Sequence, residues 1–105
     1  MKCLTIFLHA AYENEVVDCL RGAESVSGFS LSDCRGHSRH TSDDPFAAAR
    51  DRVEGFVPRV RLEVFLEDGL VDGVLKLLEH CAGGIGGAGA MGAWFVSEVG
   101  RSGRL

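Results

Sequence analysis

The pentapeptide LTIFL at residues 4–8 recurs as LEVFL at residues 62–66, and the two copies align without a gap at an offset of 58 positions. Both copies are short, apolar and rich in β-branched and aromatic side chains, which is typical of a buried strand. The match continues from residues 16–20 to residues 74–78. The second block has the i, i+3, i+4, i+7 spacing of an amphipathic helix, counted from residue 71. Each copy is therefore predicted to be a strand followed by a helix.

A second strand is expected after each helix. Phe29 and Leu31 alternate with serines, which is the pattern of a half-buried strand, and residues 94–99 are again aromatic and β-branched. Two β-α-β units side by side form a ferredoxin-like split βαβ fold of the α+β class. In that fold a four-stranded antiparallel sheet carries both helices on one face. We expect one domain over residues 1–105. Its second sheet face would be uncovered and apolar, which predicts an oligomer.

The composition of the 105 residues, with 46% hydrophobic and 25% charged side chains, is that of an ordinary globular chain. A net charge of −4 gives no overall attraction to nucleic acid, so no nucleic-acid partner is expected. No apolar run approaches the roughly 18–20 residues of a membrane span, so no direct membrane insertion is expected either. We interpret residues 3–8 as a strand of a cytoplasmic protein rather than as a short signal peptide.

The four cysteines are Cys3, Cys19, Cys34 and Cys81, and they form neither a C-x-x-C pair nor a metal-finger spacing. Three of them lie within or beside apolar patterns. We therefore predict buried or half-buried free thiols, as in a reducing compartment, and no disulfide framework. At the start of the second helix, Asp68 is the predicted N-cap.

Two long connections interrupt the regular plan. The first runs over residues 34–58, and long loops of this kind are usually functional or disordered. The second runs over residues 82–92 and is mostly glycine, with a formal G-x-G-x-x-G at residues 84–89. This motif follows a helix and precedes a strand, which is the reverse of a dinucleotide-binding turn. It is a flexible turn, which is the favoured interpretation, or a nest of backbone N–H groups for a phosphate.

Arginines and histidines supply the candidate ligands. Six of the eleven basic residues lie between Arg35 and Arg61, where acidic residues dilute their charge. A thiolate and two imidazoles, from Cys34, His37 and His40, would suit zinc, copper, cobalt or nickel. Exposed histidines without a metal are the simpler interpretation of that spacing. No catalytic pattern is present, so we expect no enzyme, although residues far apart in sequence can meet in space.

The segment GFSLSDCRGHSRH at residues 28–40 resembles the second strand and the start of the long loop in PII signalling proteins. Those proteins have the pattern Gly, apolar, Thr/Ser, apolar, any, acid, any, basic, Gly, Phe/His, Gly, Arg, Gln. The βαβ repeat, the long loop after the second strand and the glycine-rich loop before the last strand are also laid out as in PII proteins. The chain is most similar to a PII-like group encoded beside heavy-metal efflux pumps.

The resemblance implies a homotrimer that binds adenine nucleotides, ADP or ATP, in clefts between its subunits. The long loop, residues 34–58, would be mobile and would dock on a membrane transporter. The nucleotide-binding residues implied by the resemblance are Gly36, His37, Ser38, Arg39, Gly84, Gly86, Gly87, Gly89 and Arg101.

Departures from the PII pattern make a metal an equal alternative to the nucleotide. His40 replaces the glutamine that contributes to 2-oxoglutarate sensing, and Ser38 replaces a glycine. Small residues replace the acid and the lysine of the PII glycine loop. The leading hypothesis is a non-enzymatic, homotrimeric regulator that senses a nucleotide or a transition metal and acts on a transporter, with heavy-metal efflux the first choice. The alternatives are a metal buffer or chaperone and, more weakly, an enzyme.

Overall fold

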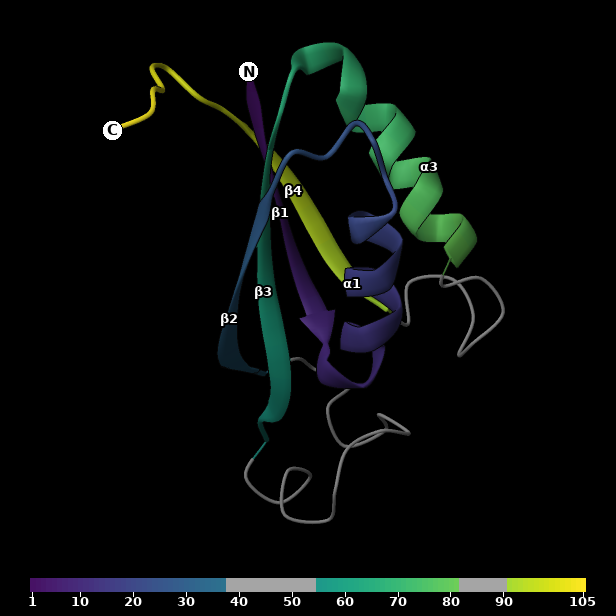
Figure 1. Ribbon diagram of the computed structural model, residues 1–105. Coiled ribbons are helices and arrows are strands. Elements are labelled where there is room, and N and C mark those ends of the chain that lie inside the picture. The colour runs from purple at the N-terminus through teal and green to yellow at the C-terminus, as the bar shows by residue number, and fades with distance from the viewer. Residues whose placement is uncertain (38–54, 82–90) are drawn as a thin grey trace.

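The computed structural model describes residues 1–37, 55–81 and 91–105. In these ranges the sheet has the strand order β2-β3-β1-β4, and every neighbouring pair is antiparallel. Both α-helices cover one face of it (Figure 1). The predicted ferredoxin-like α+β fold is therefore confirmed. The elements are β1 (Lys2–His9), α1 (Glu13–Arg21), β2 (Phe29–Gly36), β3 (Val57–Leu66), α3 (Val71–Cys81) and β4 (Gly92–Glu98).

The sequence repeat is also a repeat in space. A short 3-10 helix precedes each α-helix, at Ala10–Tyr12 and again 58 positions later at Asp68–Leu70. In the ladder between β1 and β3, Thr5 lies opposite Glu63, its own counterpart in the repeat. Two antiparallel strands that pair in this way are related by an approximate twofold axis through that residue pair. The duplicated strands therefore form the centre of the sheet, with β2 and β4 at its edges.

The core lies between the helices and the even-numbered residues of the two central strands, because successive side chains of a strand point to opposite faces. The completely buried side chains there include Leu4, Leu8, Leu62 and Val64. From the helices, Val16 and Leu20 of α1 and Val71, Val74 and Leu78 of α3 complete the cluster. Burial of each such side chain contributes about 1.5–3 kcal/mol to the stability of the fold.

The predicted bounds of the long loop, residues 34–58, are wrong at both ends. Strand β2 continues through Cys34 to Gly36, and β3 already begins at Val57. The ladder pairs Cys34 with Arg59 and Arg35 with Pro58, so backbone pairing extends the strands into a polar sequence. Pro58 is tolerated because β1 pairs with β3 only as far as Arg59, which leaves the proline with a neighbouring strand on one side.

Two smaller predictions also need correction. Asp68 does not cap α3: it lies in the preceding 3-10 helix, and its Oδ1 is 2.8 Å from the amino group of Met1. The hydrogen bond from this amino group lowers the pKa of the Asp68 carboxyl below its ordinary value. At the other connection, Gly92 belongs to β4 and not to the glycine-rich loop.

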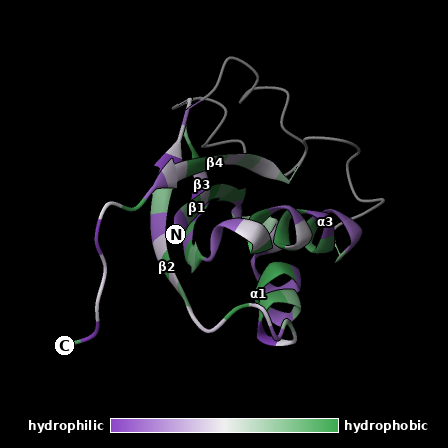
Figure 2. Cartoon of the chain, turned by 90° about the horizontal axis from the view of Figure 1, so that it is seen from above, coloured by the Kyte–Doolittle hydropathy of each residue, from purple (hydrophilic) through white to green (hydrophobic). Residues whose placement is uncertain are grey.

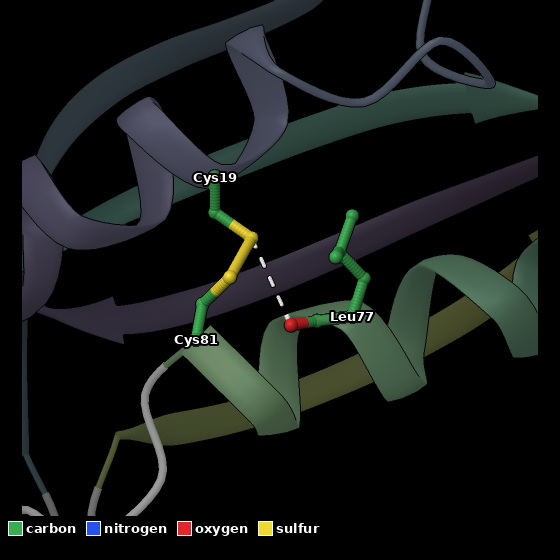
Figure 3. Close-up of a disulfide and its surroundings, with 3 residues drawn as sticks. All are labelled: Cys19, Leu77 and Cys81. Carbon is green, nitrogen blue, oxygen red and sulfur yellow. Dashed lines mark hydrogen bonds between the residues drawn. A yellow bond between two sulfur atoms is a disulfide. The ribbon is translucent and has the colours of Figure 1, made fainter.

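The prediction of free thiols without a disulfide is wrong for Cys19 and Cys81. Cys19 of α1 and Cys81 of α3 form a disulfide, with their Cα atoms 6.4 Å apart (Figure 3). Cys3, which is buried, and Cys34, which is half-buried, are free thiols. The pair is 62 residues apart in sequence and has no short motif, so only the packing of the two helices on the same sheet face brings it together.

We predict that Cys81→Ser lowers the free energy of unfolding by about 2–4 kcal/mol, because the disulfide restricts the unfolded chain over a long loop. Urea denaturation of the oxidised protein, followed by circular dichroism, measures the change. Cys34→Ser is the matched control and should leave the midpoint nearly unchanged. Equal midpoints for wild type and Cys81→Ser would contradict the cross-link.

We predict that Gly92→Ala lowers the free energy of unfolding by about 1–3 kcal/mol. Gly92 has φ of +154°, and a Cβ atom there would collide with the backbone of Phe7 and Leu8 in β1. Backbone atoms cannot move aside as a flexible side chain can, so β4 must shift away from β1. Thermal denaturation should show the loss, whereas Gly100→Ala, which meets nothing within 4 Å, should not.

Candidate functional site

The end of β2 and the start of β3 bring together several of the candidate ligands. Gly36 pairs with Val57 across the ladder, and the side chain of Arg59 lies over it. A Cβ atom at residue 36 would come within 2.8 Å of Cγ and Nε of Arg59. The absence of a side chain at Gly36 therefore lets the guanidinium stem of Arg59 cross the β2 backbone on the sheet face away from the helices.

His37 follows directly and is held by two contacts. Its Nδ1 lies 2.5 Å from the carbonyl oxygen of Gly55, and its ring centre is 5.6 Å from that of Phe56. A carbonyl oxygen only accepts hydrogen bonds, so Nδ1 carries the proton and, in the neutral ring, Nε2 keeps its lone pair. Metal-binding histidines are commonly oriented by such a bond to a carbonyl group. His37 is exposed, so its Nε2 can serve as a ligand.

Arg35 contributes positive charge next to the same aromatic ring. Its guanidinium carbon lies 5.6 Å from the ring centre of Phe56, which is a cation–π distance. Phe56 therefore supports both Arg35 and His37. With Arg59 across Gly36, this end of the sheet presents two guanidinium groups, which suit phosphate or carboxylate ligands.

The metal trio of Cys34, His37 and His40 is only partly placed. Cys34 is in β2, opposite Arg59, and His40 lies outside the described residues. Within residues 1–37, 55–81 and 91–105, no three His, Cys, Asp or Glu side chains are close enough together to hold a metal ion. A metal site would therefore need His40 or a ligand from another chain in addition to His37.

The residues predicted to bind a nucleotide are also divided. Gly36, His37 and Arg101 lie within the described parts of the chain, whereas Ser38, Arg39, Gly84, Gly86, Gly87 and Gly89 lie outside them. Arg101 lines a groove beside Phe29 and Ser30, at the start of β2, whereas Gly36 ends that strand. Strand β2 is eight residues long, so its two ends lie about 23 Å apart. One chain therefore does not bring Arg101 to Gly36.

The groove at the Arg101 end has a volume of about 670 Å³. It lies between the C-terminal residues 99–104 and the sheet face away from the helices, where Glu63 and Phe65 form its floor. Arg101 and Arg104 give it two positive charges, and Glu63 gives it one negative charge. This is a second place that can bind an anionic group, at the opposite end of β2 from His37.

On β3, β1 and β4, the sheet face away from the helices exposes three phenylalanines, together with charged residues that include the ion pair Arg61–Glu63. Phe65, Phe7 and Phe95 are 52%, 37% and 58% exposed. Phe7 and Phe95 pack edge to face at 6.1 Å, and the guanidinium carbon of Arg61 is 5.8 Å from the Phe7 ring centre. In the view from above, both helices lie on one side of the sheet (Figure 2). No helix among the described residues covers the aromatic side.

The profile of the DUF3240 family matches the chain over residues 1–105, that is, its whole length. The chain belongs to the DUF3240 family. This family is described as proteins of unknown function. No helix in the described part of this DUF3240 chain is both long enough and apolar enough to cross a membrane.

A solved structure of another DUF3240 protein, from Shewanella baltica OS155, is similar in fold. The two share 19% sequence identity at a TM-score of 0.75, over 99% of this chain and 94% of the other. At that level of identity the similarity shows the fold alone. A comparison with curated proteins finds no match.

Sequence analysis missed Gly55 and Phe56, which hold His37. Both lie inside the segment assigned to the long loop, and nothing local in the sequence places them beside residue 37. Gly55 has φ of +80°, a left-handed conformation that glycine adopts without strain. The available signal was Gly55 itself: a glycine directly before an aromatic residue and a strand that begins with valine indicates a turn that leads into β3.

We predict that the neutral ring of His37 carries its proton on Nδ1, because the Gly55 carbonyl accepts a hydrogen bond from that nitrogen. Long-range ¹H–¹⁵N correlation spectra of the neutral ring report the tautomer directly. His80, which is exposed at the end of α3, serves as the reference. A proton on Nε2 of His37 would contradict the arrangement and weaken its suitability as a metal ligand.

Proposed function

We propose that this DUF3240 chain is a cytoplasmic, non-enzymatic PII-like regulator that assembles as a homotrimer and senses a small effector. The effector is an adenine nucleotide or a transition-metal cation, and the target is a membrane transporter, with heavy-metal efflux the leading choice. The observation that carries the proposal is the bare aromatic sheet face of Phe7, Phe65 and Phe95. A surface of this kind marks an interaction site, and PII-like proteins use it to form trimers.

The division of the nucleotide-binding residues supports the same assembly. Gly36 and His37 lie at one end of β2, and Arg101 lies at the other. In a trimer, Arg101 of one subunit would reach the Gly36 end of its neighbour. The site would then form only on assembly, between subunits.

Side chains near Gly36, at the C-terminal end of β2, support each class of effector. Arg35 and Arg59 favour an anionic group such as the phosphates of ADP or ATP. The exposed Nε2 of His37 favours a metal cation instead. Both classes would bind where the chain leaves β2 and enters the long loop. An effector that binds one conformation of the long loop more tightly would make that conformation more populated. The transporter would then bind a different mixture of loop conformations, so signalling would need no chemical reaction.

We predict that the wild-type protein sediments at three times the mass of one chain and that Phe95→Asp dissociates it. Phe95 points to the aromatic face, so a carboxylate there would be buried in the trimer without a partner. Trp94→Asp is the matched control, since Trp94 is 53% exposed on the same strand but points to the helical side. Sedimentation velocity tests both variants. A monomeric wild type would overturn the trimer and the intersubunit site.

We predict that one effector class raises the melting temperature and binds in calorimetry. If the effector is ADP or ATP, Arg101→Ala should abolish the rise, while Arg21→Ala on α1 should preserve it. If it is zinc or copper, the double variant His37→Ala/His40→Ala should abolish the rise, while His80→Ala should preserve it. No shift with either class would contradict effector sensing, and nucleotide turnover would contradict a non-enzymatic role.

The geometry of His37 favours a second candidate, a metal buffer or chaperone without nucleotide sensing. Such a protein binds metal in every subunit but does not need to change the conformation of its long loop. Hydrogen exchange over residues 34–58, with and without metal, separates the two functions. A regulator should show changed protection there, and a buffer should show the same protection in both states.

A further inference from the structure

The disulfide between Cys19 and Cys81 lies at the boundary between the rigid core and the glycine-rich connection. Cys19 is in α1, next to the buried Leu20, and is itself half-buried. Cys81 is the last residue of α3 and is exposed. Figure 3 shows the sulfur–sulfur bond spanning the space between the two helices. Solvent, and therefore a thiol in solution, can reach the Cys81 side of this bond.

The last turn of α3 has no side chain in the core. The buried residues of α3 end at Leu78, and Glu79, His80 and Cys81 are all exposed. A terminal turn without buried contacts is held weakly, because helix ends fray unless packing or caps fix them. The disulfide supplies the missing attachment by joining Cys81 covalently to α1.

This attachment has a counterpart on the other side of the glycine-rich residues. The backbone N–H of His9 donates a hydrogen bond of 2.8 Å to the carbonyl oxygen of Met91. Gly92 then packs directly on the backbone of β1. The chain is therefore fixed at Met91 by hydrogen bonding and packing, and at Cys81 by a bond that a reductant can break.

The environment of Cys19 suits the reduced state as well as the oxidised one. Its Sγ lies 3.7 Å from the carbonyl oxygen of Leu77 (Figure 3). A disulfide sulfur has no hydrogen to donate, so in the oxidised protein this is only a contact. After reduction, the Cys19 thiol can donate a hydrogen bond to that oxygen. The thiol of the half-buried Cys19 thus keeps a partner, and the other thiol belongs to the exposed Cys81.

We propose that Cys19–Cys81 is a thiol–disulfide exchange site, and that its reduction releases the last turn of α3 at the entrance to the glycine-rich residues. The reductant is a small thiol or a protein dithiol. Its thiolate attacks the sulfur of Cys81, the exposed residue of the pair, the sulfur–sulfur bond breaks, and Cys19 leaves as a thiolate that takes up a proton. A second thiol of the reductant then displaces Cys81. The protein gains two electrons and two protons, and the reductant becomes a disulfide.

The test uses the wild-type chain in metal-free buffers of reduced and oxidised glutathione. We expect two free thiols in the oxidised protein and four in the reduced protein, with the conversion complete while the sheet remains folded. Backbone NMR should show loss of helical Cα shifts over residues 79–81 on reduction. The shifts of β1 and β3 should stay the same, since their ladder does not involve the disulfide.

Matched variants separate this effect from a general response to reductant. Cys81→Ser should show the released last turn in both buffers, whereas Cys34→Ser should respond as the wild type does. Four free thiols in the oxidised protein would overturn the proposal. So would a disulfide that is reduced only after unfolding in urea, or helical shifts over residues 79–81 that persist after reduction. None of these measurements requires an effector, so their outcome is independent of the proposed sensing function.

Discussion

The antiparallel pairing of β1 with β3 is the constraint on which the rest of the structure depends. Its register places Thr5 opposite Glu63, and a slip by one residue would turn every core side chain of one strand to the wrong face. In the observed register the even-numbered residues of both strands meet the helices, and the odd-numbered ones form the aromatic face. The same pairing therefore determines both where the core lies and which sheet face the helices of the described residues leave uncovered.

Much of this architecture could be predicted from the sequence, because the duplicated strand and helix patterns are local and strongly periodic. The errors occurred where contacts distant in sequence decide the outcome. Backbone pairing with β3 carries β2 past Cys34, although that sequence is polar. Asp68 meets the amino group of Met1 instead of capping a helix, and Cys19 meets Cys81 only because both helices pack on one face.

The candidate site shows the same limit. Residue type alone identified His37, and the PII-like pattern identified Gly36 and Arg101. The role of Phe56 as a support for His37 and Arg35 could not be predicted, because it depends on how β3 begins beside the end of β2. The distance between Arg101 and Gly36 likewise could not be predicted. Arg101 lies beside the start of β2 and Gly36 ends that strand, and a motif in the sequence does not show this arrangement.

The disulfide removes the equivalence of the two halves of the molecule. In the repeat, the counterpart of Cys19 is Leu77, and the Cys19 sulfur lies 3.7 Å from the carbonyl oxygen of Leu77 (Figure 3). A bond that obeyed the symmetry would join Cys19 to residue 77, but the actual partner lies one helical turn further on. The counterpart of Cys81 in the first half is Ala23, which has no sulfur. Oxidation chemistry thus acts asymmetrically on an otherwise duplicated scaffold.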